Sequence, residues 1–152
     1  MKKEKTIEVL NSLITINNDR IEGYETALKE TEEFDLKNLF SKFISTSQRC
    51  KQELVDEVNK LDGVLAEGTT TSGKFFRVWM DVKAALTGKD RKAILNSCEY
   101  GEEAAIDTYD NALENEMEHL SPEQHLMISA QRSLLIADQN HVIELRDAII
   151  DA

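Results

Sequence analysis

The chain has 152 residues, six glycines, one proline and a formal net charge of -11 at pH 7. This length fits one domain over residues 1–152, and abundant Glu, Lys, Leu and Ala beside so little proline favour an all-α fold. The negative charge argues against nucleic acid or an anionic membrane surface as a partner, because both would repel the chain. No secretory signal is visible, and no apolar run approaches the roughly 20 residues of a membrane span, so we expect a cytoplasmic protein.

The first half of the chain predicts two long helices. Residues 3–30 carry apolar side chains at alternating spacings of three and four, which is typical of one buried helix face. The predicted inner face consists of Ile7, Leu10, Ile14, Asn17, Ile21, Tyr24 and Leu28. Asp35 is expected to cap a second helix that ends at Gly63. The link between them is short, so the two helices should be antiparallel neighbours.

The second half predicts a short helix and two more long ones. Residues 68–73 are expected to form an exposed loop, and residues 75–88 a crossover helix anchored by burial of Trp79. Asp90 can cap the next helix, and Ser121, Pro122 and Gln124 give a clear start for the last. Their predicted inner faces consist of Leu95, Glu99, Glu102, Ile106, Tyr109 and Leu113, and of Ile128, Gln131, Leu135, Asp138, Val142, Leu145 and Ile149. Cys50 and Cys98 are expected to be small buried hydrophobes.

An internal repeat relates the two halves. A shift of 85 positions places Leu10, Asn11, Ser12, Ile21, Tyr24, Ala27 and Leu28 on Leu95, Asn96, Ser97, Ile106, Tyr109, Ala112 and Leu113. The repeat suggests two helical hairpins related by a pseudo-twofold axis. The same shift pairs Asn17 with Glu102, so the first half lacks that carboxylate.

Glu99 and Glu102 are the main functional clue, because both interrupt an apolar helix face. Burying an ionised carboxylate costs several kcal/mol unless a cation, a proton or hydrogen-bond donors compensate. One hypothesis is a metal site made by Glu99, Glu102, Asp138 and His141, since oxygen and nitrogen ligands suit iron, manganese or zinc. If the last turn centres near residue 118 or 119, Glu99 should lie level with Asp138.

The alternative is a buried polar layer without metal. In this interpretation the acids are hydrogen-bonded by neighbouring polar side chains, and one of them keeps its proton. The layer would consist of Asn17, Tyr24, Ser47, Tyr109 and Gln131. We favour this alternative, because a metal-binding bundle normally holds ligands in both halves.

Three sequence stretches resemble a bacterial ferritin-like four-helix-bundle family of unassigned function. They are LNSLITINNDRIEGYETAL at residues 10–28, FRVWMDVKAALTG at 76–88 and CEYGEEAAIDTY at 98–109. The resemblance implies a four-helix bundle with a short crossover helix between its second and third long helices. Metal-binding relatives of that superfamily carry a Glu-x-x-His motif on two helices. The second long helix here has no histidine, and the last offers only Asp138 and His141 at that spacing.

The favoured interpretation is therefore a non-catalytic binding or stress-associated protein with a degenerate metal centre and no resident cofactor. The alternative is an iron- or manganese-binding, ferroxidase-like protein that uses the partial site. No phosphate-binding loop or nucleophile-base arrangement supports another enzyme class. A homodimer is possible, and the sequence does not name a protein partner.

Overall fold

The computed structural model describes residues 2–69 and 73–149. Five α-helices and one 3-10 helix account for most of these residues, and they contain no strand. The helices are α1 (Lys2–Glu30), α2 (Phe34–Lys60), α3 (Gly73–Gly88), α4 (Arg91–Asn115), η1 (Met117–His119) and α5 (Pro122–Asp147). The all-α prediction is confirmed. No helix in the described ranges combines the length and apolarity that crossing a membrane requires.

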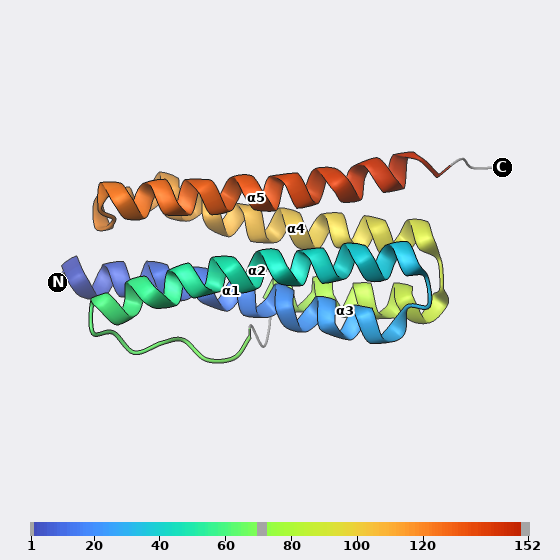
Figure 1. The fold of residues 1–152 in the computed structure, drawn as a ribbon, viewed down its shortest axis with the longest axis horizontal. Helices are drawn as coiled ribbons and strands as arrows, with labels where there is room; N and C mark the ends of the chain where they lie inside the picture. Colours follow the sequence, from blue (N-terminus) through green and yellow to red (C-terminus); the bar gives the residue numbers. More distant parts are fainter. Residues whose placement is uncertain (1, 70–72, 150–152) are drawn as a thin grey trace.

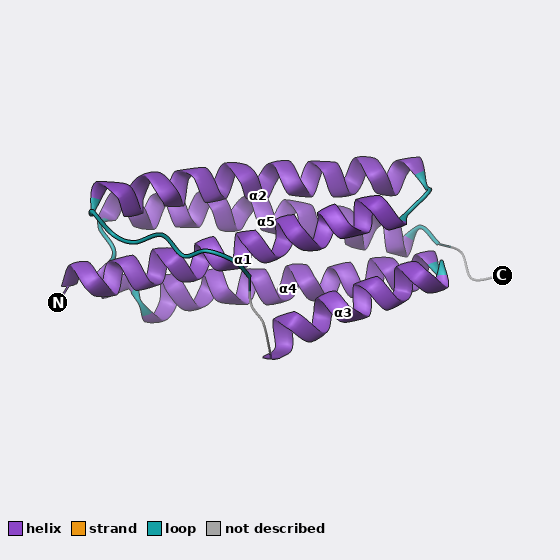
Figure 2. Ribbon diagram, turned by 90° about the horizontal axis from the view of Figure 1, so that it is seen from below, coloured by secondary structure: helices purple, strands orange, loops and turns teal. Residues whose placement is uncertain are grey.

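The four long helices lie side by side as two antiparallel hairpins, α1 with α2 and α4 with α5 (Figure 1). The linker after α2 and the shorter helix α3 carry the chain back along the bundle. As a result α2 and α4 run in the same direction, and α3 packs on the outside of α1 and α4 (Figure 2). The predicted crossover helix is therefore present. Of the loop predicted over 68–73, Gly68 is exposed and residues 70–72 lie outside the described residues.

Two of the predicted helix starts are confirmed. The Asp90 carboxylate accepts a hydrogen bond from the backbone N–H of Ala93 at 3.2 Å, which satisfies one free donor of the first turn of α4. Ser121 and Gln124 form a reciprocal capping box at the start of α5, with distances of 3.1 and 2.9 Å. Pro122 occupies the first turn, where its missing N–H costs nothing.

The predicted ends of α2 were wrong. Its N-cap is Glu33, and Asp35 lies inside the first turn, where it forms an ion pair with Arg91 at the start of α4. Hydrogen bonding to Arg91 holds the pKa of Asp35 below its ordinary value. The helix ends at Lys60, and Asp62, with φ of 56°, is the left-handed residue that turns the chain before Gly63. Asp is one of the few non-glycine residues that adopt this conformation readily.

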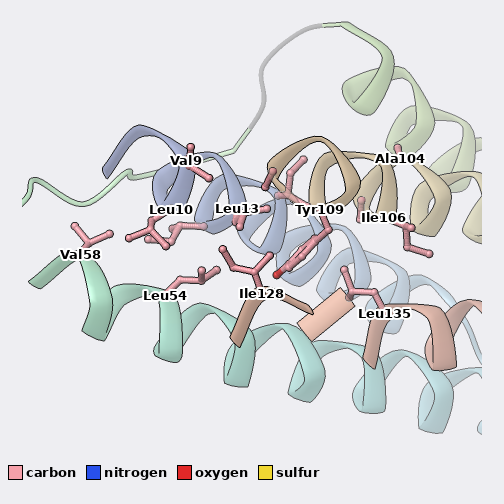
Figure 3. Packing of buried hydrophobic residues seen from close by; sticks show 14 residues of the cluster. Val9, Leu10, Leu13, Leu54, Val58, Ala104, Ile106, Tyr109, Ile128 and Leu135 are labelled. Carbon is pink, nitrogen blue, oxygen red and sulfur yellow. The ribbon is translucent and has the colours of Figure 1, made fainter. Parts of the chain in front are cut away.

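Buried apolar side chains form two clusters, one towards each end of the bundle. One cluster lies towards the start of α1 and includes Leu10, Leu13, Leu54, Val58, Ile128 and Leu135 (Figure 3). The second lies towards the start of α2 and includes Tyr24, Phe40, Phe43, Leu95, Cys98 and Val142. The buried polar side chains described below lie between these clusters. They are thereby shielded from water on both sides.

Trp79 fixes α3 to the bundle, in agreement with its predicted role. Its ring packs against both apolar clusters and meets the Tyr24 ring edge-to-face, with centroids 4.9 Å apart. Gly23 allows this approach. A Cβ atom at that position would lie 2.5–2.7 Å from three atoms of the indole.

Replacing Gly23 by alanine is therefore expected to displace Trp79 and to lower the free energy of unfolding by about 1–3 kcal/mol, the usual cost of overpacking. Trp79 is the one tryptophan of the chain, so its fluorescence reports directly on how α3 is docked. We expect red-shifted emission and a lower Tm. Gly88→Ala is the matched control, because a Cβ there meets nothing within 4 Å. Wild-type emission and stability in Gly23→Ala would show that the close contact does not fix α3.

Candidate functional site

Arg20 lies at the centre of the bundle and is completely buried. Its guanidinium donates to both carboxylate oxygens of Glu102, from Nε to Oε2 at 2.7 Å and from Nη2 to Oε1 at 2.5 Å. Nη2 also lies 3.1 Å from Asp138 Oδ2, and Nη1 donates to Ser47 Oγ at 2.6 Å. We call these four residues the Arg20 cluster. Each of the four long helices contributes one of them.

Aromatic rings lie against the buried Arg20 guanidinium. The guanidinium carbon lies 5.6 Å from the Tyr24 ring centre and 5.7 Å from that of Phe43, which adds cation–π attraction. Burial alone would lower the pKa of Arg20, but its partners, Glu102 foremost, together outweigh burial and the net shift is upwards. Burial also raises the pKa of Glu102, and Arg20 offsets only part of that shift. With both acids ionised, one guanidinium faces two carboxylates.

A second chain of hydrogen bonds crosses the bundle next to the Arg20 cluster. Asn17 Nδ2 donates to the Tyr109 hydroxyl at 2.9 Å, and that hydroxyl donates to Gln131 Oε1 at 2.7 Å. Gln131 Nε2 then donates to the Cys50 carbonyl at 3.1 Å and to Glu53 Oε1 at 2.9 Å. All four long helices take part again. The middle of the protein is thus two adjoining polar layers held together by side chains.

The two layers follow the internal repeat. The shift of 85 positions that relates Asn17 to Glu102 also relates Tyr109 to Tyr24. In one layer Asn17 is hydrogen-bonded to Tyr109. In the other, the Tyr24 ring lies beside the Arg20 guanidinium, and burial and then the charge of Glu102 raise the pKa of Tyr24. The neutral Asn17 of one layer thus corresponds to the carboxylate Glu102 in the other. Arg20 is the cation that accompanies this carboxylate.

The residues of the predicted polar layer all lie in this region. Asn17, Tyr24, Ser47, Tyr109 and Gln131 are buried. Ser47 accepts from Arg20, the Tyr24 ring lies beside it, and the other three form the second chain. The expectation that this layer hydrogen-bonds the acids was therefore wrong for Asn17, Tyr109 and Gln131, because Arg20 donates to both oxygens of Glu102. The side chains of the layer were predicted to be buried because they occupy positions on otherwise apolar helix faces.

The four predicted metal ligands do not meet at one point. Glu102 and Asp138 share Arg20, whereas Glu99 is 28% exposed and forms an ion pair with Arg146 at the edge between α4 and α5. His141 Nδ1 lies 3.5 Å from the Lys42 amine. Within the described part of the chain, no group of three or more His, Cys, Asp or Glu side chains is arranged to hold a metal ion.

Glu99 was expected to lie at the same height along the bundle as Asp138. This prediction was wrong by about one helical turn, because Glu102 lies at that height instead. Side chains tilt towards the N-terminus of their own helix, so α4 side chains reach away from the turn and α5 side chains reach towards it. Counting backbone positions equally from the turn ignores this tilt. The edge contacts confirm the register, since Arg132 with Asp110, Gln139 with Glu103 and Arg146 with Asn96 follow at steps of seven residues.

Arg20 is the residue of the candidate site that was not predicted from the sequence. It lies three residues after Asn17 and four before Tyr24, so it fits the inner face of α1 as well as Ile21 does. Arginine is rarely buried without a partner, so the hydrophobic pattern assigned the inward position to Ile21 instead. The signal that could have found it was the unexplained need of Glu102 for a cation.

Both cysteines lie beside this region with buried side chains. Burial raises the pKa of Cys50 to about 11 and raises that of Cys98 further. We expect neither thiol to react rapidly with a disulfide reagent in the native protein at neutral pH, and both to react in denaturant. A native thiol that reacts as fast as the unfolded chain would contradict the burial described here.

Residues 5–115 match the profile described as Domain of unknown function (DUF2383). The chain belongs to this family. The DUF2383 match contains Arg20, Ser47 and Glu102, whereas Asp138 lies on α5 beyond it. None of the curated proteins compared with the chain matches it.

Proposed function

We propose that this DUF2383 protein is a non-catalytic binding protein with a ferritin-like four-helix bundle, in which Arg20 supplies the central positive charge that metal supplies in metal-binding bundles. The helix order supports the fold: two antiparallel hairpins joined by a long crossover, with α2 and α4 running in the same direction. Inward polar residues at the middle of all four long helices support it as well.

The observation that carries the proposal is the bidentate pair of Arg20 with Glu102. The planar fork of a guanidinium satisfies both carboxylate oxygens at once, and Asp138 receives a further contact. The oxygen atoms that would ligate a metal are therefore already engaged by a cation that cannot be deprotonated in a protein. This donor set does not fit a resident metal, so the cluster is suited to hold the helices together.

Elemental analysis and thermal unfolding test this role. After growth with added iron and manganese, we expect the purified protein to carry far less than one metal ion per chain. Added Mn²⁺ or Fe²⁺ should leave the Tm unchanged, because a ligand raises it only by binding the native state. Arg20→Ala in the same titration shows whether the carboxylates bind metal once the guanidinium is gone.

The ferroxidase-like alternative predicts the opposite results. Stoichiometric iron or manganese in the wild type, with a metal-dependent rise in Tm that Glu102→Ala abolishes, would overturn the proposal. Glu114→Ala is the matched control, since Glu114 is an exposed carboxylate on the same helix. Nonspecific binding to the acidic surface would affect wild type and both variants equally.

A further inference from the structure

Residues 64–68, which follow α2, lie along α1 in an extended form, and we call them the strap (Figure 2). Asn11 uses both of its polar side-chain atoms to hold it. Its Nδ2 donates to the Val64 carbonyl at 2.9 Å, and its Oδ1 accepts from the Ala66 backbone N–H at 2.9 Å. A neighbouring β-strand would pair with the same two backbone groups. Asn11 therefore recognises an extended backbone.

A second asparagine holds the other end of the strap. Asn18 Nδ2 donates to the Gly68 carbonyl at 2.9 Å. Asn18 follows Asn11 by seven residues, a rise of about 10.5 Å along a helix. From Val64 to Gly68 an extended chain covers about 13 Å, so the two spacings are similar. Gly68 has a φ of 82°, which glycine adopts freely, and the strap ends there.

The strap occupies only part of the surface that it covers. Leu65 and Ala66 pack against the apolar cluster near the start of α1, while Val64 is 87% exposed. A groove of about 400 Å³ remains open beside the strap, and Ile21 and Val55 contribute to its walls. The strap therefore leaves part of the apolar surface of α1 and α2, at Ile21 and Val55, uncovered.

The charges of the groove do not suit the strap. Glu22 and Glu25 of α1 line it together with Glu67 of the strap itself, and Lys51 is the one cation among the described residues that line it. Three carboxylates thus share the groove with one ammonium group. A basic residue in place of Glu67 would remove a like charge and add an attractive one.

We propose that this groove binds an extended peptide from a partner protein, with an apolar side chain at the position of Leu65 and a basic one at that of Glu67. The strap is a tethered internal occupant of the same site. Tethering gives it a high effective concentration, so it competes strongly although its charges fit poorly. A partner peptide binds by displacing the strap, and Asn11 and Asn18 then hold the partner's backbone.

The test uses a fluorescent peptide with the sequence of residues 61–69 and Lys in place of Glu67. Fluorescence anisotropy measures how tightly this peptide binds to the wild type and to Leu65→Ser. In Leu65→Ser the packing of the strap against the bundle is weakened. We expect Leu65→Ser to bind at least about tenfold more tightly, because the tethered competitor is weakened. Adding Asn11→Ala to that variant should weaken binding about tenfold, through loss of two hydrogen bonds. Asn38→Ala, at an exposed position on α2, is the matched control.

A second peptide, of residues 61–69 with Glu67 retained, is measured in the same way. Three results would overturn the proposal: no saturable binding of the Lys peptide to Leu65→Ser, equal affinity with and without the Asn11 side chain, or equal affinity for the two peptides. If Leu65→Ser does not fold, Leu65→Ala serves as the host, since it keeps an apolar side chain on the cluster. Wild-type circular dichroism in each variant shows that the fold is intact.

Discussion

Replacing Arg20 by methionine is expected to lower the free energy of unfolding by about 3–5 kcal/mol, the usual cost of removing one partner from a buried ion pair. Methionine fills much of the space but leaves Glu102 and Asp138 inside the bundle without a cation. Both carboxylates are almost fully buried, so water cannot compensate them. Chemical denaturation at neutral pH measures the effect.

Arg49→Met is the control for this substitution, because Arg49 is exposed on α2. Its loss should change stability by less than about 0.5 kcal/mol, as is usual for surface positions. If Arg20→Met were no more destabilising than Arg49→Met, the guanidinium would not be what compensates the buried acids.

Replacing Glu102 by leucine is the second large expected effect. It leaves Arg20 Nε without an acceptor and deprives Nη2 of its closest one. An unsatisfied buried donor costs about 1–3 kcal/mol, so we expect a loss of roughly 2–4 kcal/mol, with the remaining contact to Asp138 limiting it. Glu114→Leu, at an exposed position on the same helix, should be close to neutral. A loss as small as that control's would mean that Arg20 is satisfied without Glu102.

The stability of the wild type should also depend on pH through Glu102. Burial raises the pKa of this carboxyl above its ordinary value of 4.5, so above pH 4.5 the folded state binds more protons than the unfolded state. The stability that protonated Glu102 contributes is fully present below pH 4.5. It is lost as the pH rises through the pKa that Glu102 has in the folded state. Glu102→Gln cannot titrate, so the difference in unfolding free energy between it and the wild type should change over this interval. A pH-independent difference would contradict the shift.

The sequence predicted the helices well because helix formation depends on local spacing and capping. The inner faces of α4 and α5, the cap at Asp90 and the capping box at Ser121 are set by residues within a few positions of each other. The start of α2 was misjudged because Asp35 has the chemistry of a cap. Its carboxylate is instead used by Arg91 from another helix.

The candidate site was predicted only in part, because its members meet through long-range packing. Glu102 and Asp138 were recognised as inward carboxylates from their own helices. That Arg20 would join them depends on the register between three helices, which the tilt of side chains shifts by about one turn. Glu99 has the same spacing as a core residue, yet it lies at the edge where Arg146 reaches it.

A double-mutant cycle between Arg20 and Glu102 tests the central claim most directly. The free energies of unfolding of wild type, Arg20→Met, Glu102→Leu and the double variant are compared under one condition. If the guanidinium is the counter-charge of the bundle centre, the double variant should be more stable than the sum of the single losses predicts, by about 2 kcal/mol or more. Additive losses would contradict this account, because they would show that the two side chains stabilise the protein independently.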